Sequence, residues 1–356
     1  MVKFVIIGTQ VMTLPPESYS GLEKLTWQLA NGLSGRGHEV YLAAPYGSRI
    51  PDPIHHIDSG PAGWSNPEEM AYRKYNAIVA SLLDDETVVL SHSWQGKELA
   101  LLPHPKMKMM HTFHGPNGWN MLTQTGAPIK KLSPKLRFYG VSRTHADHLS
   151  AQMGLPVGTL YNGVDPKEFW PAVGPDKGYL LYLGRIDKSK GVDKFLDGMY
   201  GLQKRILGIK GYVAGDDRHT VNPAFVDAMM YACSNAPYLE YFGTVSHQFK
   251  KKLINESAGL VFSFHEDYFE AFNLTVIEAF LSGKPVFVTE NGSMDELFTG
   301  LPWNFMPAPN NRILWDNIPS LIEDSAKIDW VKQGMRFSID KMIRAYEKEA
   351  KQFLSS

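Results

Sequence analysis

Short apolar runs alternate with helical patterns along almost the whole chain, and this alternation constrains the fold more than any other feature. Two series of runs, each bounded by Gly, Pro or polar residues, read as buried strands. The first series lies at 2–7, 38–43, 87–90, 107–113, 137–141 and 158–161, and the second at 179–184, 210–214, 238–242, 260–264 and 285–289. Alternating strands and helices form right-handed βαβ units, so the pattern predicts parallel sheets with helices on both faces.

The helical patterns and the connecting segments divide the chain into two domains. The clearest helix has leucines at 22, 25, 29 and 33, and Gly35-Arg36-Gly37 ends it. A loop-like segment with prolines at 171 and 175 separates the two series of strands. We therefore expect an α/β chain of two doubly wound, Rossmann-like domains, 1–166 and 167–334, with a cleft between them. The tail, 330–356, is an amphipathic helical pattern whose part from about 335 is expected to pack back on the first domain.

Composition excludes several classes of protein. The 36 Lys and Arg residues nearly balance the 37 Asp and Glu residues, for a net charge of -1, so nothing indicates a nucleic-acid partner. Cys233 is the only cysteine, which excludes a disulfide framework and a cysteine-based metal site. No apolar run is long enough to span a membrane, and the N-terminus reads as a strand rather than a signal peptide. A cytoplasmic protein is expected, with peripheral membrane contact left open.

Two glutamates, Glu270 and Glu278, flank the start of a predicted helix. Asn273 stands at the N-cap position and Leu274 begins the apolar face. Glu270 then lies on the loop after a buried strand, and Glu278 lies near helix amides that favour an anion. Ligands of open parallel sheets bind at the carboxyl ends of the strands, so the pair indicates a ligand with hydroxyls and phosphate, as in a nucleotide sugar. An ordinary solvated helix start is the alternative.

A basic loop with glycines at both ends, Gly184 to Gly191, follows the first strand of the second series. Arg185 offers a planar fork and Lys190 a point charge, and the glycines let the backbone approach a ligand. Two cations at a strand end can stabilise the charge that builds on a diphosphate leaving group. A charged surface turn is the alternative interpretation.

Two features of the first domain lie at the ends of predicted strands. Ser20 and Gly21 open the first helix, where backbone amides can face a phosphate. His114 follows the strand at 107–113 and can donate a hydrogen bond to a sugar oxygen. Glycines at such corners are often there for steric reasons alone, and strand-end histidines are often structural. His92, in a similar place, is interpreted as a structural histidine.

Six motifs occur in a fixed order over nearly the whole chain. They are Gly-Arg-Gly-His-Glu-Val at 35–40, Asn-Gly-Val-Asp at 162–165, the Gly-Arg…Lys-Gly loop at 184–191, Ala-Gly-Asp at 214–216, Phe-Gly at 242–243, and the two glutamates at 270 and 278 that continue into Gly-Lys-Pro-Val at 283–286. Each motif is modest, but the ordered set resembles the retaining glycosyltransferases of family 4, which have the GT-B architecture.

The resemblance implies a reaction and a donor. Enzymes of this kind move a hexosyl group from a nucleotide-diphosphate sugar to an acceptor hydroxyl and keep the anomeric configuration. A UDP- or GDP-linked sugar is the expected donor substrate. No cofactor and no metal ion are expected, because two cations of the protein take the place of a metal.

The resemblance also implies roles for particular residues. Arg185 and Lys190 resemble the pair that binds the donor diphosphate, and Glu278 the acid that binds the ribose hydroxyls. Glu270 is similar to the acid that contacts the donor sugar near its anomeric carbon, and His114 to the histidine that approaches the transferred sugar. These make Arg185, Lys190, Glu270 and His114 the expected catalytic residues. The expected donor-binding residues are Gly21, Gly184, Asn273, Leu274 and Glu278.

The chain departs from the family's pattern at several positions. Asn273 and Ser20 each stand where the family usually has glycine. Asn291-Gly292 replaces a later Gly-Gly, and Asp295 stands in the usual glutamate position. None of these changes removes a charged group from the expected site, so an active enzyme is expected.

The acceptor is expected to bind mostly to the first domain, at segments 46–67 and 116–134. Trp119 suits a sugar face, and Lys130 and Lys131 suit a phosphorylated acceptor or lipid headgroups. Carbohydrate, lipid-linked and small-molecule acceptors all stay open, as does an ordinary surface loop. Two other functions also stay open: a non-catalytic nucleotide-sugar-binding protein of the same fold, and a GT-B phosphorylase or epimerase.

Overall fold

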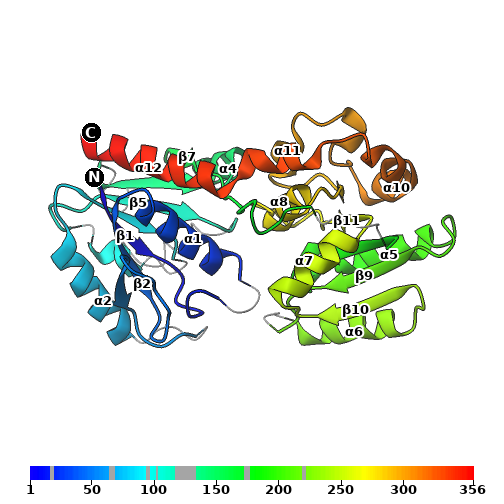
Figure 1. Cartoon of the computed structure of the whole chain (residues 1–356), viewed down its shortest axis with the longest axis horizontal. Coiled ribbons are helices and arrows are strands. Elements are labelled where there is room, and N and C mark those ends of the chain that lie inside the picture. Colours follow the sequence, from blue (N-terminus) through cyan, green and yellow to red (C-terminus); the bar gives the residue numbers. More distant parts are fainter. Residues whose placement is uncertain are drawn as a thin grey trace. The chain divides into compact units, whose positions relative to one another are not determined.

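The computed structural model describes residues 1–16, 20–63, 69–93, 97–101, 103–116, 134–171, 177–218 and 222–356. These residues form two units, each built on its own parallel sheet (Figure 1). The first unit comprises the described residues up to Gly163 together with Ile339–Ser356, and the second is Val164–Ser338. No helix in the described ranges is long and apolar enough to cross a membrane.

The sheet of the first unit has seven strands in the order β3-β2-β1-β4-β5-β6-β7. They are β1 (Lys3–Ile7), β2 (Glu39–Ala44), β3 (His55–Asp58), β4 (Thr87–Ser91), β5 (Met109–Phe113), β6 (Leu136–Gly140) and β7 (Val157–Thr159). All neighbouring strands are parallel. The strand order reverses between β1 and β4, so loops that follow these strands meet at a switch point where ligands commonly bind.

Strand β3 is the one strand of this sheet that the sequence does not predict. It lies at the edge and pairs with β2 alone. His55 and His56 are exposed, and Ile57 is its only buried apolar residue. An edge strand with one partner needs no continuous apolar run, so the apolar-run criterion finds no strand here.

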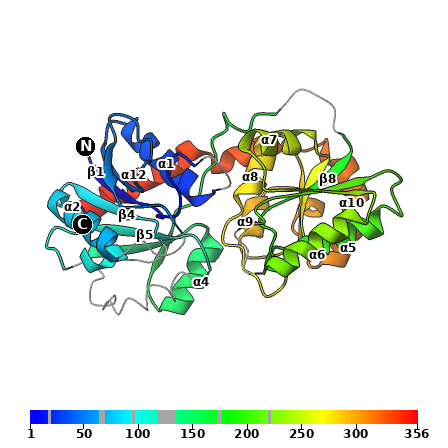
Figure 2. The same ribbon diagram turned by 90° about the horizontal axis from the view of Figure 1, so that it is seen from below.

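Helices cover both faces of this sheet. They are α1 (Leu22–Ser34), α2 (Glu69–Leu82), η1 (Lys97–Leu101), α4 (Arg143–Met153) and α12 (Ile339–Ser355). Alternate residues of β1 face opposite sides: Phe4 and Ile6 pack in a core with α1 and α12, and Val5 and Ile7 pack in a core with α2 and α4. In both views α12 lies alongside α1 (Figures 1 and 2).

The C-terminal tail is not one helix, contrary to the prediction for 330–356. It consists of α11 (Trp330–Gly334), η5 (Met335–Phe337) and α12. Ser338, between η5 and α12, has an extended backbone, with φ -71° and ψ 150°. Ser338 forms a parallel bridge with Val164. Phe337 therefore packs against Phe272 in the second unit, whereas the apolar residues of α12 pack in the first. The single apolar stripe in the sequence is divided between two cores.

The second unit has the strand order β10-β9-β8-β11-β12, all parallel. The strands are β8 (Tyr179–Leu183), β9 (Lys210–Ala214), β10 (Leu239–Gly243), β11 (Gly259–Phe262) and β12 (Val286–Val288). The helices are η3 (Lys188–Lys190), α5 (Val192–Leu202), α6 (Pro223–Ser234), α7 (His247–Glu256), α8 (Leu274–Leu281), α9 (Met294–Phe298), η4 (Trp303–Phe305) and α10 (Asn311–Ser325). Figure 2 shows α5 and α6 on one side of this sheet and α7 and α8 on the other. Its order reverses between β8 and β11, which is the second switch point.

Candidate functional site

The basic loop after β8 lies at the switch point of the second unit. The loop is hydrogen-bonded to the segment that follows β9: the N–H of Ile186 donates to the carbonyl of Asp216 at 2.8 Å. The Arg185 side chain is 39% exposed, and its Nε lies 3.9 Å from Asp187 Oδ2. That Nε is buried and has no hydrogen-bond acceptor within the described residues. The guanidinium is thus held at the sheet edge with donors available for an anion.

Lys190 lies at the end of η3, a turn that Asp187 caps by accepting from the N–H of Ser189 at 2.9 Å. Its Nζ is 2.6 Å from Glu270 Oε2 and 4.5 Å from the centroid of the Tyr268 ring. Burial alone would lower the pKa of Lys190, but Glu270 and Tyr268 outweigh it and raise that pKa above its ordinary value. Lys190 is therefore a charged ammonium in direct contact with Glu270.

Two glycines allow the loops around this ion pair to approach each other. Gly191 has φ 73°, and a Cβ there would lie 1.7 Å from the carbonyl oxygen of Ser263. Gly292 has φ 48°, and a Cβ there would lie 2.1 Å from the carbonyl oxygen of Glu270. A side chain at either position would force the backbone of Lys190 or of Glu270 out of place.

Asn291 holds the loop that carries Glu270. Its Oδ1 accepts from the N–H of Glu270 at 2.7 Å, and its Nδ2 donates to the carbonyl of Tyr268 at 2.6 Å. The carbonyl of Glu270 accepts from the N–H of Ser293 at 2.9 Å. The sequence marks Asn291 only as a departure from Gly-Gly, and its role in fixing Glu270 is visible only in the structure.

Glu278 lies on α8, which begins where the sequence predicts. Asn273 is the N-cap, and its side chain accepts from the N–H of Val276 at 3.3 Å. Glu278 Oε1 accepts from Lys250 Nζ, on α7, at 2.7 Å. Glu278 Oε2 is buried and has no hydrogen-bond donor within the described residues. A buried carboxylate oxygen without a donor is costly, so this oxygen is suited to accept from a ligand hydroxyl. Lys250, which sequence reasoning missed, holds the other oxygen.

The remaining predicted residues lie beside these. Gly184 directly follows β8, and Leu274 is the first residue of α8. Gly21, in the first unit, is the N-cap residue of α1, and having no side chain it leaves the first N–H groups of the helix without a side-chain acceptor from this position. Near it the buried carboxylate of Glu23 accepts from the hydroxyls of Thr9 and Ser20, so the serine that replaces glycine here bonds to the first turn of α1.

His114, also in the first unit, follows β5 and is half-buried. Its Nε2 lies 2.9 Å from Nδ1 of His92, which follows β4 and is fully buried. Burial lowers the pKa of His92 to about 3. Burial, reinforced by His92, His145 and His111, lowers the pKa of His114 well below its ordinary value. Both rings are therefore neutral at pH 7.

A second buried group lies beside the two histidines. Glu98 of η1 accepts from the hydroxyls of Ser91 and Ser93, the latter at 2.7 Å. His111 Nδ1 lies 2.6 Å from the hydroxyl of Ser91. Because that hydroxyl donates to Glu98, its oxygen must accept from the N–H of His111. Burial raises the pKa of Glu98 against the effect of its hydroxyl donors.

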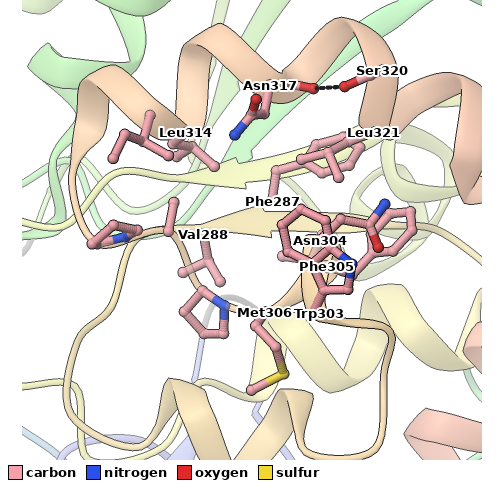
Figure 3. A pocket seen from close by; sticks show the side chains of 15 residues that line it. Phe287, Val288, Trp303, Asn304, Phe305, Met306, Leu314, Asn317, Ser320 and Leu321 are labelled. Carbon is pink, nitrogen blue, oxygen red and sulfur yellow. Dashed lines mark hydrogen bonds between the residues drawn. The ribbon is translucent and has the colours of Figure 1, made fainter.

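A pocket of about 370 Å³ lies elsewhere in the second unit, among β12, η4 and α10. Figure 3 shows its lining, which is largely apolar and includes Phe287, Phe305 and Leu314. Trp303, at its rim, is 87% exposed. None of the predicted donor-binding residues lines it.

Two further points concern ligands. Within the described ranges, no group of three or more His, Cys, Asp or Glu side chains is arranged to hold a metal ion. The predicted acceptor residues Trp119, Lys130 and Lys131 lie outside the residues that the structure describes.

Comparisons with known proteins identify the family. Residues 19–168 match the model of Glycosyltransferase Family 4, and residues 166–327 match that of Glycosyl transferases group 1. No significant match is found among curated protein sequences. Among solved structures, sucrose-phosphate synthase from Thermosynechococcus elongatus is 15% identical in sequence, with a TM-score of 0.76. The alignment covers 100% of this chain and 100% of that one.

Two more structures show the same fold. A glycosyltransferase from Rickettsia africae is 19% identical, with a TM-score of 0.76 and coverage of 99% of this chain and 98% of that one. The Anabaena protein HepE in complex with UDP-glucose is 14% identical, with a TM-score of 0.71 and coverage of 99% and 100%. The two consecutive family matches and the shared GT-B fold show that this chain is a family 4-like, group 1 glycosyltransferase.

Proposed function

We propose that this glycosyltransferase moves a hexosyl group from a UDP- or GDP-linked sugar to an acceptor hydroxyl, with retention of configuration and without a bound metal ion. The observation that carries the proposal is the cation pair at the switch point of the second unit. Arg185 has donors available there, and Lys190 is held as a charged ammonium by Glu270. HepE, a structural relative, is described in complex with UDP-glucose, which supports a donor of this class.

The chemistry follows from the charges. As the bond between the sugar and the diphosphate breaks, negative charge builds on the phosphate oxygens. Arg185 can bind two of these oxygens through its fork, and Lys190 adds a charge that is already oriented. In the retaining scheme the leaving phosphate takes the proton of the acceptor hydroxyl on the same face. Arg185 and Lys190 then act chiefly on the transition state.

The other residues bind the two ends of the donor. The unpaired Oε2 of Glu278 accepts from a ribose hydroxyl, and Glu270 contacts the sugar hydroxyls near the anomeric carbon. His114 donates to the transferred sugar from the first unit. The acceptor is a hydroxyl of a carbohydrate, a lipid-linked molecule or a small metabolite.

The test measures release of free nucleoside diphosphate from a panel of nucleotide sugars, with and without a metal chelator. We expect one donor to turn over. Arg185→Ala should lower kcat by about a hundredfold with little change in donor Kd, because its contact strengthens in the transition state. Glu278→Ala should instead weaken donor binding, as measured by calorimetry. Arg312→Ala is the matched control, because this arginine on α10 is 91% exposed.

Three results would contradict the proposal. Loss of all turnover on chelation would remove metal independence, and full activity in Arg185→Ala would remove the diphosphate assignment. Formation of sugar 1-phosphate or of an epimerised donor would indicate a phosphorylase or an epimerase instead.

A further inference from the structure

His92 makes a contact in the first unit that the proposed reaction does not use. Its Nδ1 lies 2.9 Å from Nε2 of His114, with the ring centroids 5.2 Å apart. The position of His92 is fixed on two sides. Its backbone N–H donates to the carbonyl of Ile7 at 2.8 Å, and its ring packs against Tyr346 of α12 at a centroid distance of 5.6 Å.

The contact links the protonation of the two rings. Each neutral imidazole carries one proton, and two facing ring nitrogens form a hydrogen bond only when one of them carries it. If His92 donates from Nδ1, then His114 carries its own proton on Nδ1. If His114 donates from Nε2 instead, then His92 carries its proton on its own Nε2, and Nδ1 of His114 is a bare acceptor.

The surroundings of His92 decide between the two arrangements. His92 Nε2 is buried and has no hydrogen-bond partner in the part of the chain that the structure describes. In the second arrangement this atom is a buried N–H without an acceptor, whereas in the first it is only an unused lone pair. Buried N–H groups without an acceptor are rarer than under-satisfied acceptors, so the first arrangement is favoured.

We propose that His92 is a positioning residue that donates to Nε2 of His114 and thereby holds His114 as the Nδ1–H tautomer. His114 then presents a neutral hydrogen-bond donor, and never a base, to whatever oxygen approaches Nδ1. The assignment of that oxygen to the donor sugar rests on the proposed function; the tautomer itself does not. His92, interpreted from the sequence as structural, thus sets the chemical character of the residue expected to touch the sugar.

The direct test is the tautomer of His114 in the free protein. Long-range proton–nitrogen correlation spectra of protein labelled with ¹⁵N-histidine distinguish a protonated from a bare ring nitrogen. His114→Asn assigns the signals by removing one set. In the parent protein at pH 7 we expect a protonated Nδ1 and a bare Nε2 for His114. A protonated Nε2, or an imidazolium with both nitrogens protonated, would overturn the inference.

The second test removes the donor. In His92→Phe, His114 should shift towards the Nε2–H form that free histidine favours. If the proposed function holds, kcat should fall about tenfold, the value of one hydrogen bond, with donor Kd unchanged. His55→Phe, which replaces an exposed histidine of edge strand β3, is the matched control. An unchanged His114 tautomer in folded His92→Phe would contradict the inference. The expected tautomer in a protein that turns over no nucleotide sugar would contradict only the proposed function.

Discussion

At the scale of single residues, Lys250 shows how one side chain can set the use of another. It binds one oxygen of Glu278 at 2.7 Å, and the other oxygen is buried without a donor. Its Nζ also lies 5.2 Å from the centroid of the Phe169 ring. Because the ammonium fixes the rotation of the carboxylate, the unpaired oxygen faces a constant direction. A carboxylate held in this way can select a ligand by its hydroxyls.

We predict that Lys250→Met weakens the preference for ribose. The methionine keeps an apolar stem near Phe169 but leaves Glu278 free to rotate. The parent should bind UDP or GDP about tenfold more tightly than the 2′-deoxy form, as one charge-assisted hydrogen bond implies. In Lys250→Met that ratio should approach one, measured by calorimetry. Lys250→Arg keeps the charge, and Lys252→Met alters an exposed lysine on the same helix; both should keep the ratio. If Lys250→Met keeps the parent's ratio of affinities for the ribose and 2′-deoxy forms, the ion pair with Glu278 does not orient the carboxylate for the ribose.

At the scale of elements, α8 is a helix that local signals specify fully. Asn273 caps it as predicted, and its side chain accepts from the N–H of Val276. The family usually has glycine at this position. Glycine is nearly as good an N-cap as asparagine, whereas alanine costs about 1 kcal/mol. Either glycine or asparagine can therefore begin this helix. The side chain of Asn273 is not required for the helix alone and can also contact a ligand.

We predict that Asn273→Ala lowers the free energy of unfolding of the second unit by about 1 kcal/mol, or about 2–4 °C in Tm. Asn273→Gly should lose only a few tenths of that energy. Asn310→Ala is a matched control, because Asn310 caps α10 in the same way. It should lose similar stability and leave nucleotide binding unchanged, whereas both Asn273 variants should change that binding. Thermal unfolding with and without nucleoside diphosphate measures both effects. Equal stability of Asn273→Ala and the parent would show that the cap contributes nothing.

The elements also show where prediction from sequence ends. Buried strands and capped helices were predictable because their signals are local, as for β8 and α8. The break at Ser338 was not, because it depends on pairing with Val164, far away in the chain. The same holds for site residues. Lys190 and Glu270 stand in recognisable motifs, but Lys250 and Asn291 act through hydrogen bonds to residues 28 and 21 positions away. No periodicity encodes such contacts.

At the scale of the whole molecule, the part of the chain that the structure describes passes from the first unit to the second after Gly163 and returns after Ser338. The two crossings lie side by side, because Val164 bridges to Ser338 and its N–H donates to the carbonyl of Phe337 at 3.0 Å. The last helix, α12, then completes the core of the first unit with Tyr346 and Phe353. Each unit has its own core, so the two can respond differently to solution conditions.

The buried histidines should make the first unit more sensitive to acid than the second. Burial lowers the pKa of His92 and of His111 to about 3, and that of His145 to about 4. Unfolded histidine has a pKa of about 6.5, so between pH 6.5 and 3 the unfolded chain binds protons that the folded unit does not. The stability from the neutral rings is therefore full above pH 6.5 and is lost as pH falls towards 3. Glu98 acts in the opposite sense, because its raised pKa stabilises the folded unit at low pH.

We predict that the free energy of opening of β1 and β4 falls steeply from pH 7 to pH 5, while that of β8 and β9 changes less. Each histidine contributes a slope of about 1.4 kcal/mol per pH unit near pH 5, and the raised pKa of Glu98 offsets part of the sum. Hydrogen exchange of the strand amides at several pH values measures both units in one sample. His145→Gln should reduce the pH dependence of the opening free energy of the first unit by the contribution of one histidine, about 1.4 kcal/mol per pH unit. His148→Gln, on the same helix but only half-buried, is the control. Equal slopes in the two units, or an unchanged slope in His145→Gln, would contradict the prediction. Either result would show that these rings are protonated in the folded state.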